Sequence, residues 1–189
     1  MCLLLPSCGT YSVLRPADNL AEGRFEVQAG AAISTVPELL PVLKADVGIT
    51  DWLEAGAQWE VYNALVGARI GLLKSETHGI ALAIGVQAGL ADIARLEKSS
   101  SQWSNRFVIS PNVTIGRRFN KIELYLGTKA LLAVSDFAGT EVFTAKLGLR
   151  WTANELGFIT VEGGASAHRF LGSGYLFVGE GSGSIGVSF

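Results

Sequence analysis

The chain has 189 residues, and its 15 Lys and Arg against 17 Asp and Glu give a formal net charge of −2. This length fits one domain, and the charge argues against a nucleic-acid-binding protein, which normally has a basic surface. Hydrophobic residues make up 49% of the sequence and charged residues 17%, so the chain is more apolar than most water-soluble domains. It offers no run of about 20 apolar residues, which excludes a transmembrane helix.

From residue 24 onward, apolar and polar residues alternate with a period of two, as in strands whose two faces meet different surroundings. Ten strands are predicted, at residues 24–33, 42–49, 53–61, 64–72, 80–90, 107–118, 122–132, 143–151, 159–168 and 177–189. The sixth carries Pro111, which cannot donate to a ladder and predicts a bulge or bend. If the fourth or sixth strand is miscounted, the number becomes eight.

The predicted connections alternate in length along the chain. Short to moderate turns at residues 50–51, 74–79, 119–121 and 152–157 fall on one side of the sheet, and loops at 34–41, 91–105, 136–140 and 169–174 fall on the other. An even number of strands with short turns on one rim and longer loops on the other is typical of bacterial outer-membrane barrels. Because unpaired backbone groups are costly in hydrocarbon, a spanning sheet must close on itself. We therefore predict an all-β fold, a closed antiparallel up-and-down transmembrane β-barrel over residues 24–189.

The polar face of the strands carries charges of both signs in balance. We expect it to line a narrow lumen of ion pairs and water, where the charges serve internal packing. The predicted lumen charges are Glu26, Lys44, Asp46, Glu54, Arg69, Glu123, Lys129, Lys146, Arg150 and Glu162, and Arg24, Glu60, Arg118 and Glu180 share their face. Aromatic residues near strand ends are expected at the level of the lipid headgroups. These are Trp52, Trp59, Tyr62, Trp103, Phe119, Tyr125, Trp151 and Phe158.

Two stretches resemble known outer-membrane barrels. Residues 182–189, with alternating Ile185 and Val187 and a final Phe189, resemble the C-terminal strand that the barrel-assembly machinery recognises. Residues 43–58, LKADVGITDWLEAGAQ, are similar to a hairpin that is common in small outer-membrane barrel families. The resemblance covers residues 24–189 at the level of pattern. It implies a bacterial outer-membrane protein with lipids and the assembly machinery as partners, and with a structural, adhesive or small-solute passage role.

Residues 1–23 lack the alternation of the rest of the chain. The run L-P-S-C-G at residues 5–9 resembles a bacterial lipobox, which implies lipidation of Cys8. Pro6 departs from the usual small or aliphatic residue, and residues 1–7 do not supply a complete signal peptide, so we expect the natural start to lie upstream. The alternative is that Cys2 and Cys8 are two thiols of a ragged terminus, or a disulfide. Residues 9–23 are expected to form a periplasmic tether or a small plug at the barrel mouth.

Catalytic chemistry has little support in the sequence. The chain has the residue types of a hydrolase in His168, Ser166, Ser173 and Glu180. This set resembles some outer-membrane lipid A deacylases, which carry a His-x-Ser element followed by a Glu on the next strand. Phe170 stands where that serine belongs, so a lipid hydrolase is the minor alternative. The chain has no CxxC pair or His/Cys cluster, and we expect no metal and no cofactor.

A soluble barrel is the other alternative. In a lipocalin-like carrier the apolar face would turn inward around an apolar ligand and the charges would turn outward. The two folds therefore differ in where Phe25, Leu147 and Val187 lie, and where Glu54 and Lys146 lie.

Overall fold

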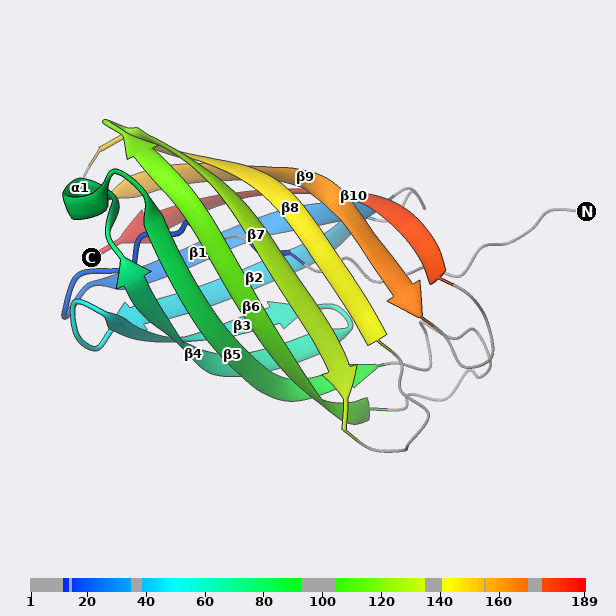
Figure 1. Ribbon diagram of the computed structural model, residues 1–189. Helices are drawn as coiled ribbons and strands as arrows, with labels where there is room; N and C mark the ends of the chain where they lie inside the picture. Colours follow the sequence, from blue (N-terminus) through cyan, green and yellow to red (C-terminus); the bar gives the residue numbers. More distant parts are fainter. Residues whose placement is uncertain are drawn as a thin grey trace, which may run out of the picture.

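The chain forms one closed barrel of ten antiparallel strands in which neighbours in sequence pair and the first strand closes the ring against the last (Figure 1). We describe a computed structural model at residues 12–13, 15–34, 39–92, 105–134, 141–154, 156–169 and 175–189. The strands are β1 (Phe25–Ser34), β2 (Leu39–Gly48), β3 (Leu53–Glu60), β4 (Asn63–Leu73), β5 (Ala81–Asp92), β6 (Asn105–Phe119), β7 (Ile122–Ala133), β8 (Glu141–Thr152), β9 (Gly157–Arg169) and β10 (Tyr175–Ser188), and the one helix within these residues is α1 (Ser75–His78). The predicted closed ten-stranded barrel is confirmed, and the count of eight is wrong.

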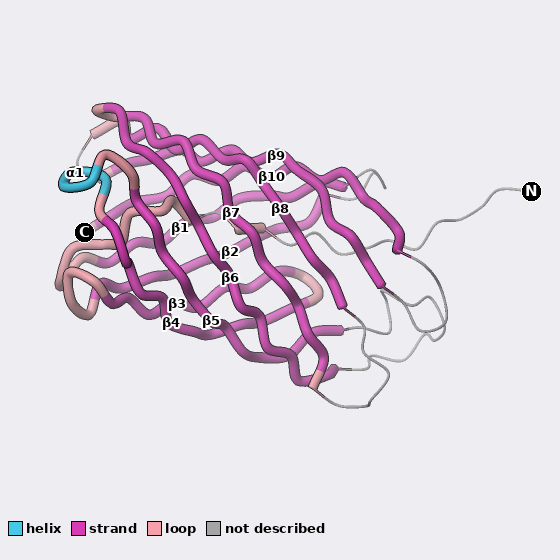
Figure 2. The backbone as a smooth tube through the Cα atoms, in the orientation of Figure 1, coloured by secondary structure: helices cyan, strands magenta, loops and turns pink. Residues whose placement is uncertain are grey.

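The two ends of the barrel differ (Figure 2). One end, which we name the turn rim, gathers short connections between β2 and β3, β6 and β7, and β8 and β9, together with α1 between β4 and β5. The opposite end, the loop rim, includes the tight turn at Val61 and Tyr62. The predicted loops there have residues 35–38, 93–104, 135–140 and 170–174 outside the described residues. In the part of the chain that the structure describes, no helix is long and apolar enough to span a membrane.

The apolar face of the sheet points outward. Leu147 is 65% exposed, whereas its neighbour Lys146 is fully buried. The same holds along the strands, where Phe25 and Val187 lie outside and Glu54 lies inside. Successive side chains of a strand point to opposite faces. Each of the ten strands has exposed apolar side chains, so the apolar outer face continues around the whole ring. The arrangement contradicts the soluble-carrier alternative, in which the apolar face would surround an interior ligand.

Pro111 does not produce the predicted bulge. Val86 pairs with Pro111 on the β5 side, and on the β7 side the pairs Ile109–Leu132 and Asn112–Lys129 keep one register. A proline removes one ladder donor, and the intact pairs on both sides hold β6 in place. The sheet shifts register instead on β4, between Gly71 and Leu73.

Three of the predicted headgroup aromatics lie inside the barrel. Tyr62, Tyr125 and Phe158 are buried, whereas Trp52 and Trp151 are exposed. Inward-facing glycines on neighbouring strands explain two of the three. A Cβ on Gly148 would lie 2.2 Å from the Tyr125 ring, and one on Gly186 would lie 2.2 Å from the Phe158 ring. The two rings therefore lie over strand glycines, because any side chain at Gly148 or Gly186 would overlap them.

Candidate functional site

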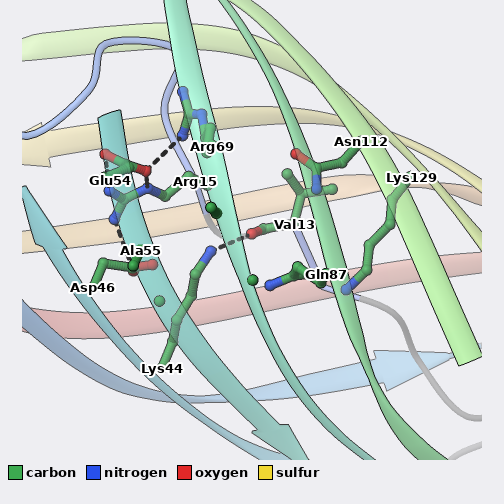
Figure 3. A pocket seen from close by; sticks show the side chains of 13 residues that line it. Val13, Arg15, Lys44, Asp46, Glu54, Ala55, Arg69, Gln87, Asn112 and Lys129 are labelled. Carbon is green, nitrogen blue, oxygen red and sulfur yellow. Dashed lines mark hydrogen bonds and ion pairs between the residues drawn. The ribbon is translucent and has the colours of Figure 1, made fainter. Parts of the chain in front are cut away.

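The lumen is occupied by the chain's own N-terminal segment. We name residues 12, 13 and 15–20 the plug. Ser12, Val13, Arg15 and Ala17 are buried, although they precede the first strand. Figure 3 shows Val13 and Arg15 among side chains that project from β2, β3, β4 and β7. The plug therefore lies deeper in the barrel than the predicted plug at its mouth.

The wall holds the plug through its main-chain N–H groups. Ser12 N donates to Glu60 Oε1 at 2.9 Å, and Val13 N donates to Glu162 Oε2 at 3.1 Å. Closer to the turn rim, Ala17 N donates to Glu123 Oε1 at 2.8 Å and Leu20 N donates to Glu54 Oε2 at 3.0 Å. These acceptors come from the separate strands β3, β7 and β9. Charged acceptors make stronger hydrogen bonds than neutral ones, so the plug is bound along its length.

The plug's carbonyl groups are also satisfied by the wall. Gln58 Nε2 donates to Ser12 O at 3.0 Å, and Lys44 Nζ donates to Val13 O at 3.0 Å, as Figure 3 shows for the latter. Arg69 Nη2 donates to Pro16 O at 2.5 Å and to Ala17 O at 2.6 Å. A buried segment without secondary structure of its own needs such partners for its backbone. The polar face of the barrel supplies them.

Arg15 is the one charged side chain that the plug places in the middle of the lumen, within the described residues. Its guanidinium lies 2.7 Å from Asp46 Oδ2 and 3.6 Å from Glu26 Oε2, and it contacts both carboxylate oxygens of Glu54. Figure 3 shows Asp46 and Glu54 on two sides of the group. The flat, many-donor guanidinium suits this task better than an ammonium group. Arg15 thus joins carboxylates from β1, β2 and β3.

The same carboxylates reach the wall's own cations. Arg69 Nη1 lies 3.6 Å from Glu54 Oε1. Arg150 makes a two-pronged contact with Glu26 and lies over the Phe158 ring, 3.7 Å from its centroid. Glu26 and Glu54 are therefore shared between the plug and the wall, and removal of Arg15 would leave each with only part of its compensation.

Strand glycines make room for the plug. A Cβ on Gly127 would lie 2.6 Å from Val13 Cγ1, and one on Gly71 would lie 3.0 Å from Asn19 Cγ. At the turn rim the segment is fixed further, because Ser75 N donates to Asp18 Oδ1 at 2.9 Å and Gly23 N donates to Gly48 O at 2.9 Å. The wall lacks side chains where the plug passes, so the two are shaped for one another.

Little space remains around Arg15. A cavity of about 40 Å³ lies between the plug and residues of β2 to β7, which leaves room for a few water molecules. Among the described residues, no group of three or more His, Cys, Asp and Glu is arranged to hold a metal ion.

The structure places all ten predicted lumen charges in the interior. Those that contact the plug or the carboxylates around Arg15 are Glu26, Lys44, Asp46, Glu54, Arg69, Glu123, Arg150 and Glu162. Lys129 lines the small cavity, and Lys146 Nζ lies 3.1 Å from Glu180 Oε2, away from Arg15.

Sequence reasoning missed Arg15. The alternation assigns Arg24 and Arg118 to the lumen face, so acidic and basic residues there are predicted to be equal in number. In the structure the Arg118 side chain is 43% exposed and Arg24 is half-buried, both toward the turn rim. The deep wall is therefore richer in carboxylates than in cations. That surplus is the signal that predicts a cation from outside the strands.

Two of the candidate hydrolase residues, Ser166 and Glu180, belong to a packed polar cluster. Ser166 Oγ donates to Glu180 Oε1 at 2.8 Å and lies 2.8 Å from Thr144 Oγ1, while the second oxygen of Glu180 meets Lys146. His168 is fully buried on the same face of β9 as Ser166. Ser173 lies outside the described residues, as do Cys2 and Cys8.

Phe189 lies at the closing seam. Phe25 N donates to Phe189 O at 3.1 Å, and Phe189 N donates to Phe25 O at 2.8 Å, while the Phe189 side chain is exposed on the outer face. Its backbone thus continues the pairing of β10 with β1.

Comparisons with known proteins give a likeness in structure. No family model and no curated protein matches the chain. Among solved structures, the crystal structure of the N-terminal β-barrel domain of Pseudomonas aeruginosa OprF matches over 90% of this chain and 100% of that chain, at 9% identity and a TM-score of 0.37. At this identity and TM-score the likeness carries no argument about activity, so a function must be inferred from this chain's own geometry.

Proposed function

We propose that the chain is an integral protein of the bacterial outer membrane whose barrel is closed at rest by its own N-terminal segment, and that it has a structural role. The observation that carries the proposal is the polarity of the wall, which is apolar outside and charged inside. A soluble monomer rarely exposes a continuous apolar surface of this extent. Outward-facing Phe25, Ile84, Leu126, Leu147 and Val187 come from strands all around the ring.

Strand length also supports a membrane position. The strands span 8 to 15 residues, and a transmembrane strand needs about 9 to 11 tilted residues. Closure of the ring leaves no sheet edge to satisfy in lipid. Length, closure and polarity agree on the same environment.

Support for a structural role comes from the filled lumen. The plug's main chain is bound from β2, β3, β4, β7 and β9, and Arg15 joins three carboxylates inside the lumen. Small-solute passage would require these contacts to break together. We therefore place passage second to a structural role.

Membrane fractionation tests the location. We expect the full chain in sarkosyl-insoluble membranes, with a mobility in SDS gels that changes on heating, because a closed barrel resists SDS until it is heated. Recovery of the chain as a fully soluble monomer would contradict the proposal.

Planar-bilayer recording tests the closed lumen. We expect no discrete channel openings from the natural chain over long recordings. Regular openings would contradict the structural role and support small-solute passage. A variant that lacks residues 12–20 provides the positive control, since it removes the plug and all its contacts with the wall.

The proposed partners are the outer-membrane lipids and the barrel-assembly machinery. The position of Phe189 at the β1–β10 seam supports an assembly signal there. Deletion of Phe189 should lower the amount of chain inserted in the membrane, whereas replacement by tyrosine, which keeps an aromatic terminus, should preserve most of it. Lipidation of Cys8 stays a proposal, which mass spectrometry of the mature N-terminus would test.

We propose no catalytic role for the His168 cluster. The contacts of Ser166 with Glu180 and Thr144, and of Glu180 with Lys146, support a packing role. Cells that overproduce the chain should keep their lipid A unchanged. Deacylated lipid A that disappears on replacing Ser166 with alanine would contradict this view.

A further inference from the structure

A second cavity opens at the turn rim, where the plug leaves the lumen. Its volume is about 510 Å³, which lies in the range of small-molecule sites. We name it the vestibule. The residues that matter for its chemistry are Arg24, Glu26, Arg118, Lys121, Arg150 and Asn154. Leu20 of the plug also lines it. The vestibule and the small cavity around Arg15 share no lining residue, so the two are separate.

The described residues that line the vestibule carry more positive than negative charge. Arginines line it from residue 24, just before β1, and from β6 and β8, and a lysine lines it from the turn after β6. Glu26 is the one carboxylate among its described lining residues. Glu26 is already compensated, since it meets both Arg150 and Arg15. Arg118 is shared with Glu123 at 3.2 Å and Asp18 at 3.7 Å. Lys121 Nζ donates to the neutral carbonyl of Ala153 at 3.1 Å. The positive charge of Lys121 therefore meets a neutral acceptor there.

Arg150 gives the vestibule a fixed donor. It is 8% exposed, its guanidinium is held by Glu26 on one side, and the Phe158 ring lies 3.7 Å from it. A guanidinium held in one plane is suited to carboxylate or phosphate oxygens, because little conformational freedom is lost on binding. Toward the rim, Asn154 Oδ1 accepts from Gly157 N at 2.7 Å, so this oxygen is already engaged.

We propose that the vestibule binds a small multivalent anion that bears carboxylate or phosphate groups. Arg150 forms the base of the site, and Lys121 and Arg24 supply charge at its opening. The proposal does not depend on the membrane location, because the vestibule is a property of the folded barrel. Anion binding can therefore fail while the membrane location holds, and the membrane location can fail while anion binding holds.

Isothermal titration of the full chain in a neutral detergent tests the site. Citrate and pyrophosphate are the probes, so that the two arms distinguish carboxylate from phosphate recognition, and glucose is the uncharged control. We expect saturable binding of at least one anion, with an affinity that falls as salt is raised. The double variant Arg24→Gln, Lys121→Gln should bind about tenfold more weakly, because it loses charge-assisted contacts at the opening.

A matched variant separates the site from general surface charge. Arg117→Gln with Lys74→Gln removes two exposed cations from the same end of the barrel, and neither lines the vestibule. It should bind like the natural chain. The proposal is overturned if neither anion binds saturably, or if both double variants lose affinity equally. Heat-modifiable mobility of each variant verifies that the barrel has folded.

Discussion

The two halves of the lumen are filled in different ways. Toward the turn rim, wall carboxylates meet a segment that is not part of the sheet, and Arg15 is the centre of that contact. Toward the loop rim, Ser12 of the plug still meets Gln58 and Glu60, and wall side chains also meet one another. Lys146 pairs with Glu180 across β8 to β10, and Leu65, Val108, Leu131 and Val142 form an apolar cluster inside the barrel. The difference shows that one inward face can be stabilised both by contacts within the wall and by a separate segment of the chain.

The comparison is tested most strongly by replacing Arg15 with methionine. The change removes the cation that Asp46, Glu54 and Glu26 share, so their buried negative charge is no longer fully compensated. Loss of one partner of a buried ion pair costs about 3–5 kcal/mol. We expect a decrease of this size in the free energy of unfolding, measured by urea titration in lipid vesicles. An unchanged free energy of unfolding would mean that the plug does not stabilise the half of the lumen at the turn rim.

Replacing Lys146 with methionine tests the loop half. Glu180 then loses its cation but keeps the hydrogen bond from Ser166, so we expect a decrease of about 3 kcal/mol, at the lower end for a buried pair. Because Lys146 and Arg15 contact different carboxylates, the two changes should add within about 0.5 kcal/mol in the double variant. Strong non-additivity would show that the halves are coupled and that the comparison is wrong.

A smaller effect is expected from replacing Gly127 with alanine, which tests the fit of the plug. The new Cβ would lie 2.6 Å from Val13 Cγ1, and overpacking of this kind costs about 1–3 kcal/mol. A second change, Val13→Ala, should restore most of the loss. Gly163→Ala is the matched control, since its Cβ would have nothing within 4 Å. Failure of the rescue would place the clash elsewhere.

The smallest effect is expected outside the lumen. Lys74 Nζ lies 3.9 Å from Asp51 Oδ2, and their side chains are 48% and 68% exposed. Asp51→Asn should change the free energy of unfolding by less than about 1 kcal/mol, because water screens exposed pairs. A loss comparable to that of the Arg15 variant would remove the distinction between lumen and surface charge.

The sequence predicts the wall well because a strand's period of two is a local signal. The alternation around Glu54 or Lys146 needs no knowledge of distant residues to assign a side chain to one face. Boundaries differ by a few residues, as at β2, which begins at Leu39 instead of residue 42. Pro111 is an error of the opposite kind, since a local rule predicts a bulge that the two neighbouring strands prevent.

The plug could not be predicted in the same way. Residues 12–20 have no periodicity, and their partners lie up to 149 residues away in the chain, as Val13 and Glu162 do. In the loop half Leu131 and Leu132 are both apolar, so polarity does not separate them. The period of two carried on from Lys129 assigns Leu132 outward, and Leu131 is buried inside. The pattern of alternation assigns a residue to the inner or outer face. It does not show which distant segment contacts the inner face, because that depends on the folded chain.

The seam between β1 and β10 has a consequence for biosynthesis. The segment that lies along the barrel axis precedes the first strand, and the ring is completed only when the final strand joins the first. The simplest order of events is that the leading residues settle against nascent hairpins and the last pairing then encircles them. Pairing of the C-terminal strand thus encloses the plug, so truncation of β10 would also release the plug.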